Sequence, residues 1–274
     1  PWKITFVNKL GMSEDGQDAG GLFMEFLLKL SEVAFSKEVG FFDESTTGFL
    51  IPNSNSFEIS SVHLKVFEFL GFIVGISIVN RTQIWPNLST FFLNNVLGLS
   101  NPFNELKNLD QDLYKNLILL MEYEGDVEND FGLNFTVTEK LKNKKHIEKE
   151  LIPNGSNINV TNENKLLYIR RVAQYKLETQ FKDQSEAFRT GLDKVLEEDA
   201  YKLFTANELR QIIAGFDKEI NLIDWKMNTV YDHFNMSNKE HVKLINTFWE
   251  IVWELEVKET EMLLFFVTSM KRPP

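Results

Sequence analysis

Cysteine is absent from the 274 residues of this chain. Its absence excludes disulfides, zinc–thiolate sites and thiol nucleophiles from the chain. Histidine is scarce as well, and the four histidines show neither HExxH nor HxH spacing. The GxSxG elbow of serine hydrolases is also missing. We therefore predict no assembled catalytic site, no metal site and no cofactor.

Long hydrophobic runs are lacking too. The longest covers residues 69–79, which is short of the roughly 20 residues that a membrane-spanning helix needs. Residues 1–6 do not show the charged and apolar blocks of a signal peptide. We therefore expect no membrane partner and a cytoplasmic or nuclear location.

Positive charge is in the minority. The formal net charge is −11 and the isoelectric point is about 5.0, so the surface repels nucleic-acid phosphates unless a basic patch intervenes. The best such patch, KLKNKKHIEK at residues 140–149, has no interleaved aromatic residues for base stacking. We interpret it as a solvated loop and expect no nucleic-acid partner.

Hydrophobic residues are plentiful, at 43% of the chain with 24 phenylalanines, which is enough for a large core. A helix is predicted from Ser60 or Ser61 to Asn80, apolar nearly all round and therefore buried. Gly71 and Gly75 share one face of it, where a neighbouring helix can come close. Residues 49–57 are predicted to form two short extended pieces joined by a turn.

Helix starts are marked by several local signals. Capping boxes are predicted at Thr205 with Glu208 and at Ser237 with Glu240. Thr161 is predicted to cap a helix over residues 162–177. The apolar run 263–267 has the pattern of a strand.

Residues 113–135 are predicted to combine a helix, an acidic loop and a strand. Leu113, Leu117, Leu120 and Met121 form an apolar stripe at helical spacing, and Asp110 is the candidate N-cap. An alternation of apolar and polar residues after the acidic segment predicts a strand over residues 133–137. An apolar ledge beside an acidic lip has the pattern of a docking surface.

The acidic lip consists of carboxylates that alternate with other residues: Glu122, Glu124, Asp126, Glu128 and Asp130. With no lysine or arginine among them, the lip must be solvated or meet a basic partner. An EF-hand calcium loop is excluded by ligand positions. Phe131 stands where the loop needs glycine, and Val137 where it needs the bidentate glutamate.

A co-linear set of motifs extends along the chain. They are DAGG at 18–21, YEGDVENDFGLNFTV at 123–137, VTNEN at 160–164, AFRTGL at 187–192, LFTANEL at 203–209, FW at 248–249 and FVTSMKRPP at 266–274. Together they resemble the catalytic domain of HECT-type E3 ubiquitin ligases. FGLNFTV and FVTSMKRPP are most similar to the proteasome-associated branch, which adds the proteasome to the expected partners.

The resemblance implies an α+β fold that is mostly α-helical, with two lobes and short strands. The N-lobe would cover residues 1–214, with a subdomain at about 108–176 that binds the ubiquitin-conjugating enzyme (E2). A hinge would follow at Gly215, Phe216 and Asp217, and residues 218–274 would form the first part of the C-lobe.

The family carries ubiquitin on a cysteine of the C-lobe, and here the chain departs from the family pattern. None of its residues is a cysteine. The resemblance places the catalytic cysteine beyond Pro274, so we expect no catalytic residue within the chain.

The resemblance also implies a groove that accepts a phenylalanine of the E2. Its lining positions fall on Leu113, Asn116, Leu117, Tyr123, Phe131, Leu133 and Tyr168. Plain core packing is the alternative interpretation of the leucines. The whole protein would take ubiquitin as a cysteine thioester from the E2 and pass it to substrate lysines, with ubiquitin and protein substrates as partners. The alternative function is a non-catalytic HECT-like scaffold that only binds partners.

Overall fold

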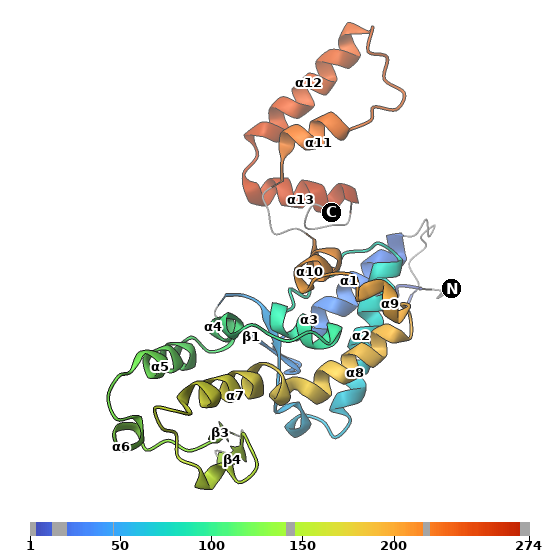
Figure 1. Cartoon of the computed structure of the whole chain (residues 1–274). Helices are drawn as coiled ribbons and strands as arrows, with labels where there is room; N and C mark the ends of the chain where they lie inside the picture. Colours follow the sequence, from blue (N-terminus) through green and yellow to red (C-terminus); the bar gives the residue numbers. More distant parts are fainter. Residues whose placement is uncertain (1–3, 13–20, 46, 141–145, 216–219, 269–274) are drawn as a thin grey trace.

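The computed structural model describes residues 4–12, 21–45, 47–140, 146–215 and 220–268. Within these ranges the fold is mostly helical with two short antiparallel hairpins (Figure 1), as the resemblance implied. The helices are α1 Gly21–Ala34, α2 His63–Val79, α3 Thr90–Leu97, α4 Leu106–Leu109, α5 Gln111–Glu122, α6 Val127–Phe131, α7 Lys165–Leu177, α8 Lys182–Asp193, α9 Glu198–Tyr201, α10 Ala206–Ala214, α11 Leu222–Asn228, α12 Lys239–Glu254 and α13 Val257–Thr268. The strands are β1 Phe42–Glu44, β2 Leu50–Pro52, β3 Thr136–Lys140 and β4 His146–Glu150.

Elements α1 to α10, with the two hairpins, form the larger part of the fold, which we call the large body. Helices α2 and α8 lie at its centre and approach each other closely at their glycines. A Cβ atom on Gly71 would lie 1.9 Å from the Phe188 carbonyl oxygen, and one on Gly191 would lie 1.9 Å from that of Glu68. These distances leave no room for a side chain. The predicted close approach at Gly71 and Gly75 is therefore confirmed, and the chain accepts the lower helix propensity of glycine at the point of contact.

Phenylalanine rings fill the space around this helix pair. Phe42, Phe67, Phe92 and Phe188 are each fully buried. The Phe92 and Phe188 ring centroids are 5.2 Å apart and nearly perpendicular, and Phe42 lies 5.4 Å from Phe67. Ring contacts at such distances add to the free energy of burying each ring.

The first hairpin corrects one sequence prediction. Within residues 49–57 only Leu50–Pro52 is extended, and its partner is Phe42–Glu44 rather than a second piece of the same segment. Ser56–Glu58 forms a turn of 3-10 helix instead. The Leu50 amide also donates to the Asn87 carbonyl at 2.8 Å, so long-range pairing decides where this strand lies.

The second hairpin pairs Thr136–Lys140 with His146–Glu150. The predicted loop at 140–149 is therefore wrong for Lys140, which ends β3, and for residues 146–149, which belong to the exposed strand β4. Residues 141–145 lie outside the described part. Strand β3 also starts later than the predicted residue 133. Val127–Phe131 is helical and Gly132, with φ 56°, ends that helix.

Several helix starts differ from their predicted positions, while others are as predicted. Thr205 and Glu208 form the expected capping box. Helix α7 begins after Asn164 rather than after Thr161. Helix α12 begins after Asn238 rather than after the predicted Ser237, and the Asn238 side chain accepts from the Glu240 amide at 3.0 Å. Helix α2 likewise begins at His63, slightly after the predicted serines.

Helices α11–α13 form a separate group beyond α10 in Figure 1. Trp249 is buried at its centre, where its indole N–H donates to the Tyr231 hydroxyl and its ring meets that of Trp225 at 6.0 Å. The predicted strand at residues 263–267 is wrong, because this run is the last part of α13. Across the described residues, none of the helices is long and apolar enough to cross a membrane.

Candidate functional site

Helix α5 carries the apolar ledge predicted from the sequence. Its N-cap is Asp110, whose carboxylate accepts from the Leu113 amide at 2.9 Å, as expected from its position. Leu117 and Leu120 are each only 3% exposed, and α5 packs with this face against α7. Leu113 lies at the edge of the core, half-buried, while Asn116 is exposed.

The acidic segment folds into the short helix α6 rather than an open loop. Asp126 is its N-cap and accepts from the Asn129 amide at 3.1 Å and from the Asn129 side chain at 2.7 Å. These bonds to the charged form hold the pKa of the Asp126 carboxyl below its usual range. The underside of α6 is anchored by Val127, which is fully buried.

An aromatic pair spans the two ends of this segment. The rings of Tyr123 and Phe131 meet edge to face with 4.9 Å between centroids. The Tyr123 hydroxyl donates to the Asp130 carboxylate. This hydrogen bond favours the neutral phenol and raises the pKa of Tyr123, and the negative charge of Asp130 adds to the shift. Phe131 remains 42% exposed, so its ring is held in place and still reaches solvent.

Tyr168 and Leu133 lie on the side of the site formed by α7 and the chain before β3. Tyr168 is 8% exposed and its ring stands edge to face on Phe135 at 5.6 Å; burial raises the pKa of its phenol. Leu133 is half-buried, and its carbonyl accepts from the Val160 amide at 2.8 Å. Leu117 and Tyr168 thus belong to the core beneath the site.

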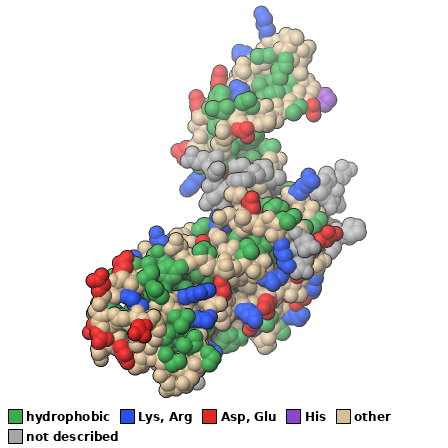
Figure 2. All heavy atoms as spheres, viewed as in Figure 1, with side chains coloured by type: hydrophobic (Ala, Val, Ile, Leu, Met, Phe, Trp, Pro, Cys, Tyr) green, Lys and Arg blue, Asp and Glu red, His purple; other side chains and the backbone are tan. Residues whose placement is uncertain are grey.

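The predicted site residues therefore fall into two groups. Leu117 and Tyr168 are buried, whereas the others reach the surface fully or in part, namely Leu113, Asn116, Tyr123, Phe131 and Leu133. Figure 2 shows hydrophobic side chains gathered over the α5 and α7 region, with acidic side chains at the adjoining α6 end. The surface combines apolar contact area with negative charge. Whether the seven predicted site residues line one groove for an E2 side chain is not tested by the structure, and the groove stays a prediction.

Sequence reasoning missed the side chains that attach α6 to the start of α7. Asn162 accepts from the Val127 amide at 3.0 Å and donates to the Gly125 carbonyl at 2.8 Å. The Lys165 ammonium donates to the Tyr123 carbonyl at 2.6 Å. The VTNEN motif holds Asn162, but no spacing rule assigns a partner that lies so far away in the sequence.

The chain leaves the large body after α10, at the predicted hinge. The Ile84 amide donates to the Ile213 carbonyl at 2.9 Å, which attaches the last turn of α10 to the segment before α3. Gly215 follows with φ 79° and ψ 176°, a conformation that glycine adopts readily. Phe216 and Asp217 lie outside the described residues, and the hinge stays a prediction.

The catalytic cysteine of the whole protein was expected beyond Pro274. Pro274 lies outside the described residues, as do the other residues that follow Thr268. The 274 residues themselves include no cysteine, and the expectation that the chain holds no catalytic residue stays a prediction. The position of the cysteine beyond Pro274 stays a prediction.

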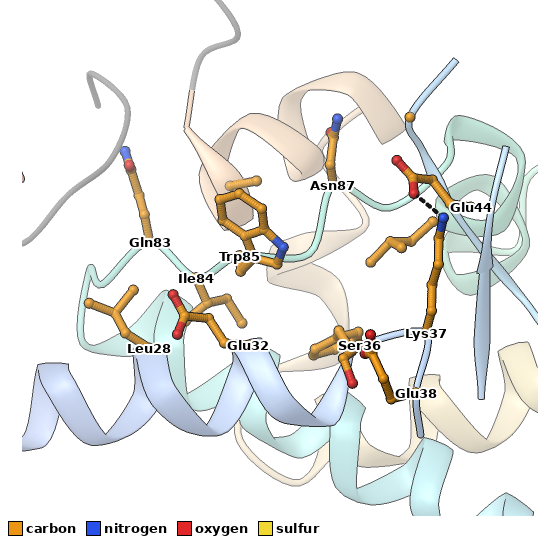
Figure 3. Close-up of a pocket in the computed structure, with 14 residues that line it drawn as sticks. Leu28, Glu32, Ser36, Lys37, Glu38, Glu44, Gln83, Ile84, Trp85 and Asn87 are labelled. Carbon is orange, nitrogen blue, oxygen red and sulfur yellow. Dashed lines mark ion pairs between the residues drawn. The ribbon is translucent and has the colours of Figure 1, made fainter. Parts of the chain in front are cut away.

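A cavity of about 370 Å³ lies beside the end of α10, and Ala214 forms part of its wall. Figure 3 shows Trp85 and Glu32 on one side of it, with Lys37 reaching across to Glu44 on the other. An ion pair between the α1–β1 connection and β1 therefore forms part of the cavity wall. Its charged and apolar lining gives no catalytic constellation.

Metal binding was predicted to be absent. Among the residues with described positions, no group of three or more histidine, cysteine, aspartate or glutamate side chains has a geometry that could hold a metal ion. The acidic side chains of α6 are engaged instead by asparagines and a tyrosine. Asn159, for example, donates to Glu128 at 2.9 Å.

The family model and the similar proteins found by comparison with known proteins all concern ubiquitin ligases or transferases. The sequence model of the family described as "HECT-domain (ubiquitin-transferase)" matches residues 28–274. A probable E3 ubiquitin protein ligase of Schizosaccharomyces pombe is 36% identical over 274 residues, which is 100% of this chain and 26% of that protein. Ubiquitin-protein ligase E3B of Homo sapiens is 34% identical over 99% of this chain and 26% of its own length.

A third similar protein is the E3 ubiquitin-protein ligase HUL5 of Saccharomyces cerevisiae, which is 33% identical over 99% of this chain and 29% of its own length. The chain therefore spans between a quarter and a third of each of these curated relatives. Similarity covers the whole chain, including α5, α6 and the start of α7.

Proposed function

The chain belongs to the HECT-domain family of ubiquitin transferases, and on this premise we propose that it recruits a ubiquitin-conjugating enzyme. The E2 docks on the surface formed by α5, α6 and the start of α7. The observation that carries this proposal is the Phe131 ring, 42% exposed and held edge to face by Tyr123 at the border of an acidic patch. A pre-ordered exposed aromatic ring is a typical anchor of a protein interface.

Charge supports the same assignment. The five carboxylates of the acidic lip are all exposed, so they attract basic side chains on a partner. Such complementarity mainly accelerates association and selects the partner, and it is weakened by salt. An E2 whose ligase-binding loop offers a phenylalanine beside basic residues matches this surface in both chemistry and charge.

The E2-binding test uses the 274-residue chain and an E2 with a phenylalanine in its ligase-binding loop. We expect measurable binding, weakened about tenfold or more by Phe131→Ala, because truncating an aromatic anchor typically costs this much. Phe57→Ala is the matched control, since Phe57 is 51% exposed on a 3-10 turn outside the α5–α7 region. Equal binding by Phe131→Ala and the parent would show that the E2 docks elsewhere.

The whole protein, by this proposal, accepts ubiquitin from the E2 as a thioester on a cysteine beyond Pro274 and transfers it to lysines of protein substrates, with the proteasome as a further partner. Because this chain contains no cysteine, it should not carry ubiquitin itself. We expect no reducible ubiquitin adduct after incubation with ubiquitin-charged E2. A reducible adduct on this chain would contradict that part of the proposal.

A non-catalytic scaffold is the second candidate, since the surface described here serves binding and not chemistry. Binding of an E2 is compatible with both candidates. They differ in whether the whole protein discharges ubiquitin from a charged E2 onto itself or a substrate. Absence of discharge by the whole protein, with binding intact, would favour the scaffold.

A further inference from the structure

We propose that Asn162 is a positioning residue for the E2-binding surface, acting together with Lys165 as a polar clamp on the segment between α5 and α6. The clamp consists of three hydrogen bonds: Asn162 donates to the Gly125 carbonyl and accepts from the Val127 amide, and Lys165 donates to the Tyr123 carbonyl. This inference rests on the proposed function. It adds the residues that hold the recognition aromatics in place without touching the partner.

The segment needs such a clamp because its backbone leaves regular structure. Helix α5 ends at Glu122, and Tyr123 has the extended values φ −67° and ψ 127°. Its carbonyl therefore falls outside the helical hydrogen-bond pattern and accepts from Lys165 at 2.6 Å. Gly125 also lies between the two helices, and its carbonyl accepts from the Asn162 side chain at 2.8 Å.

Helix α6 needs a partner for its first amide as well. Amides in the first turn of a helix have no acceptor within the helix. Asp126 accepts from the Asn129 amide, while the Val127 amide donates to Asn162 at 3.0 Å. One asparagine side chain, by using its oxygen and its nitrogen, thus fixes residues on both sides of Asp126.

The clamp is itself held in a defined conformation. Asn164 donates to the Asn159 carbonyl at 2.9 Å and accepts from the Thr161 amide at 2.8 Å. Val160 is fully buried, and its amide donates to Leu133. The turn before α7 is therefore a fixed support, which explains why α7 starts at Lys165 and not at Asn162.

Tyr123 and Phe131 lie at the two ends of the clamped segment. Their edge-to-face contact at 4.9 Å closes the segment into a loop, so the direction of the Phe131 ring depends on the path of the chain between them. Because a partner must otherwise order this segment at a cost in free energy, clamping it beforehand increases affinity. Loss of the clamp is expected to reduce E2 binding without removing any contact to the E2.

Burial separates this role from a structural one. Asn162 and the segment 124–126 are exposed, and the bond from the Val127 amide to Asn162 is only partly buried, so water can reach the groups left unpaired and global stability should change little. The buried side chains beneath them, Val127 and Val160, stay in the core. A variant at Asn162 should therefore alter local order and binding while the unfolding midpoint stays close to that of the parent.

The test compares Asn162→Ala and Asn162→Asp with Asn157→Ala in the 274-residue chain. Asn157 lies in the same polar segment, but among the residues that the structure describes its side chain bonds only within its own turn, to Asn154 at 2.7 Å. The readouts are hydrogen exchange at the Val127 amide, the unfolding midpoint, and binding of the E2 with a phenylalanine in its ligase-binding loop.

We expect Asn162→Ala to speed exchange at the Val127 amide and to weaken E2 binding by about three- to tenfold, the range that corresponds to one or two lost hydrogen bonds. Asn162→Asp keeps the acceptor for Val127 and loses the donor to Gly125, so it should retain protection at Val127 and bind with intermediate affinity. Asn157→Ala should match the parent in all readouts.

Unchanged exchange at Val127 in Asn162→Ala would overturn the clamp. Faster exchange with unchanged E2 binding would overturn its positioning role. If the parent chain does not bind the E2 at all, the proposed function fails, and the positioning role fails with it. The exchange at Val127 then still shows whether the hydrogen bonds form, so the two failures are distinguishable.

Discussion

The Tyr123 ring stands edge to face on the Phe131 ring, and its hydroxyl donates to Asp130, the residue just before Phe131. One tyrosine therefore fixes both the aromatic and the acidic part of the α6 surface. The ring contact restrains Phe131, and the hydrogen bond restrains a carboxylate of the acidic lip. The proposed binding of an E2 to this surface therefore depends on the contacts that Tyr123 makes with Asp130 and Phe131.

Removal of the Tyr123 hydroxyl should separate these two effects. We expect Tyr123→Phe to keep the ring contact and to weaken E2 binding less than Phe131→Ala does.

In the parent, the phenol of Tyr123 should ionise above its ordinary pH range, because Asp130 raises its pKa. Titration of the tyrosine by NMR checks this, and Asp130→Asn should bring the titration back toward the ordinary range.

Truncation of the buried residues under the site should act through stability. Leu117→Ala is expected to lower the free energy of unfolding by about 2–5 kcal/mol, because it opens a cavity in a close-packed region. Tyr168→Ala should be comparable, since its ring is 8% exposed and packs on Phe135. Urea unfolding measures both effects.

The same variants show how the groove is to be tested. If Leu117→Ala loses E2 binding only to the extent that it unfolds, the residue supports the surface from beneath. Loss of binding by a variant that remains fully folded would instead mean that Leu117 contacts the E2 directly.

The contact between α2 and α8 should tolerate no added side chain. Gly71→Ala places a Cβ atom 1.9 Å from the Phe188 carbonyl oxygen, so the helices must move apart. We expect a loss of at least about 1–3 kcal/mol in the free energy of unfolding, as for overpacked cores. Gly21→Ala is the control, because a Cβ on Gly21 meets no atom of the described residues within 4 Å, and the stability of this variant should be unchanged or slightly higher.

A pH-dependent contribution to stability is expected where α2 meets the end of α8. Glu68 accepts hydrogen bonds from Lys194 and from Lys65, the latter at 2.7 Å, and these lower the pKa of its carboxyl to about 2 from the ordinary 4.5. A lowered pKa in the folded state means that the carboxylate stabilises the fold above the ordinary pKa. This contribution is lost as the pH falls from about 4.5 to about 2.

Glu68→Gln should therefore be less stable than the parent at pH 7, and the difference should disappear toward pH 2. Denaturant unfolding at several pH values measures it, and added salt should reduce it. Glu186→Gln is the control, since Glu186 is 58% exposed and 3.8 Å from its lysine. A stability difference for Glu68→Gln that is independent of pH would contradict an ionic origin.

Features that depend on neighbouring residues alone were predictable from the sequence. The caps at Asp110 and Thr205 were identified because the acceptor and the amide lie within one turn. The spacing of Gly71 and Gly75 likewise indicated a close helix contact. The motifs of the family determined the fold class and the class of function.

Tertiary structure decided the remaining features. Residues 263–267 are apolar without interruption, a pattern that suits a strand or a helix, and they are helical in α13. Phe131 fits the strand alternation, yet it lies in a helix that Asp126 begins and Gly132 ends. Asn162 forms hydrogen bonds with residues 35 and 37 positions earlier in the chain. No pattern of neighbouring residues predicts a partner at such a separation. Hydrogen bonds and burial between distant segments, and not propensity, determine which apolar residues remain exposed for a partner.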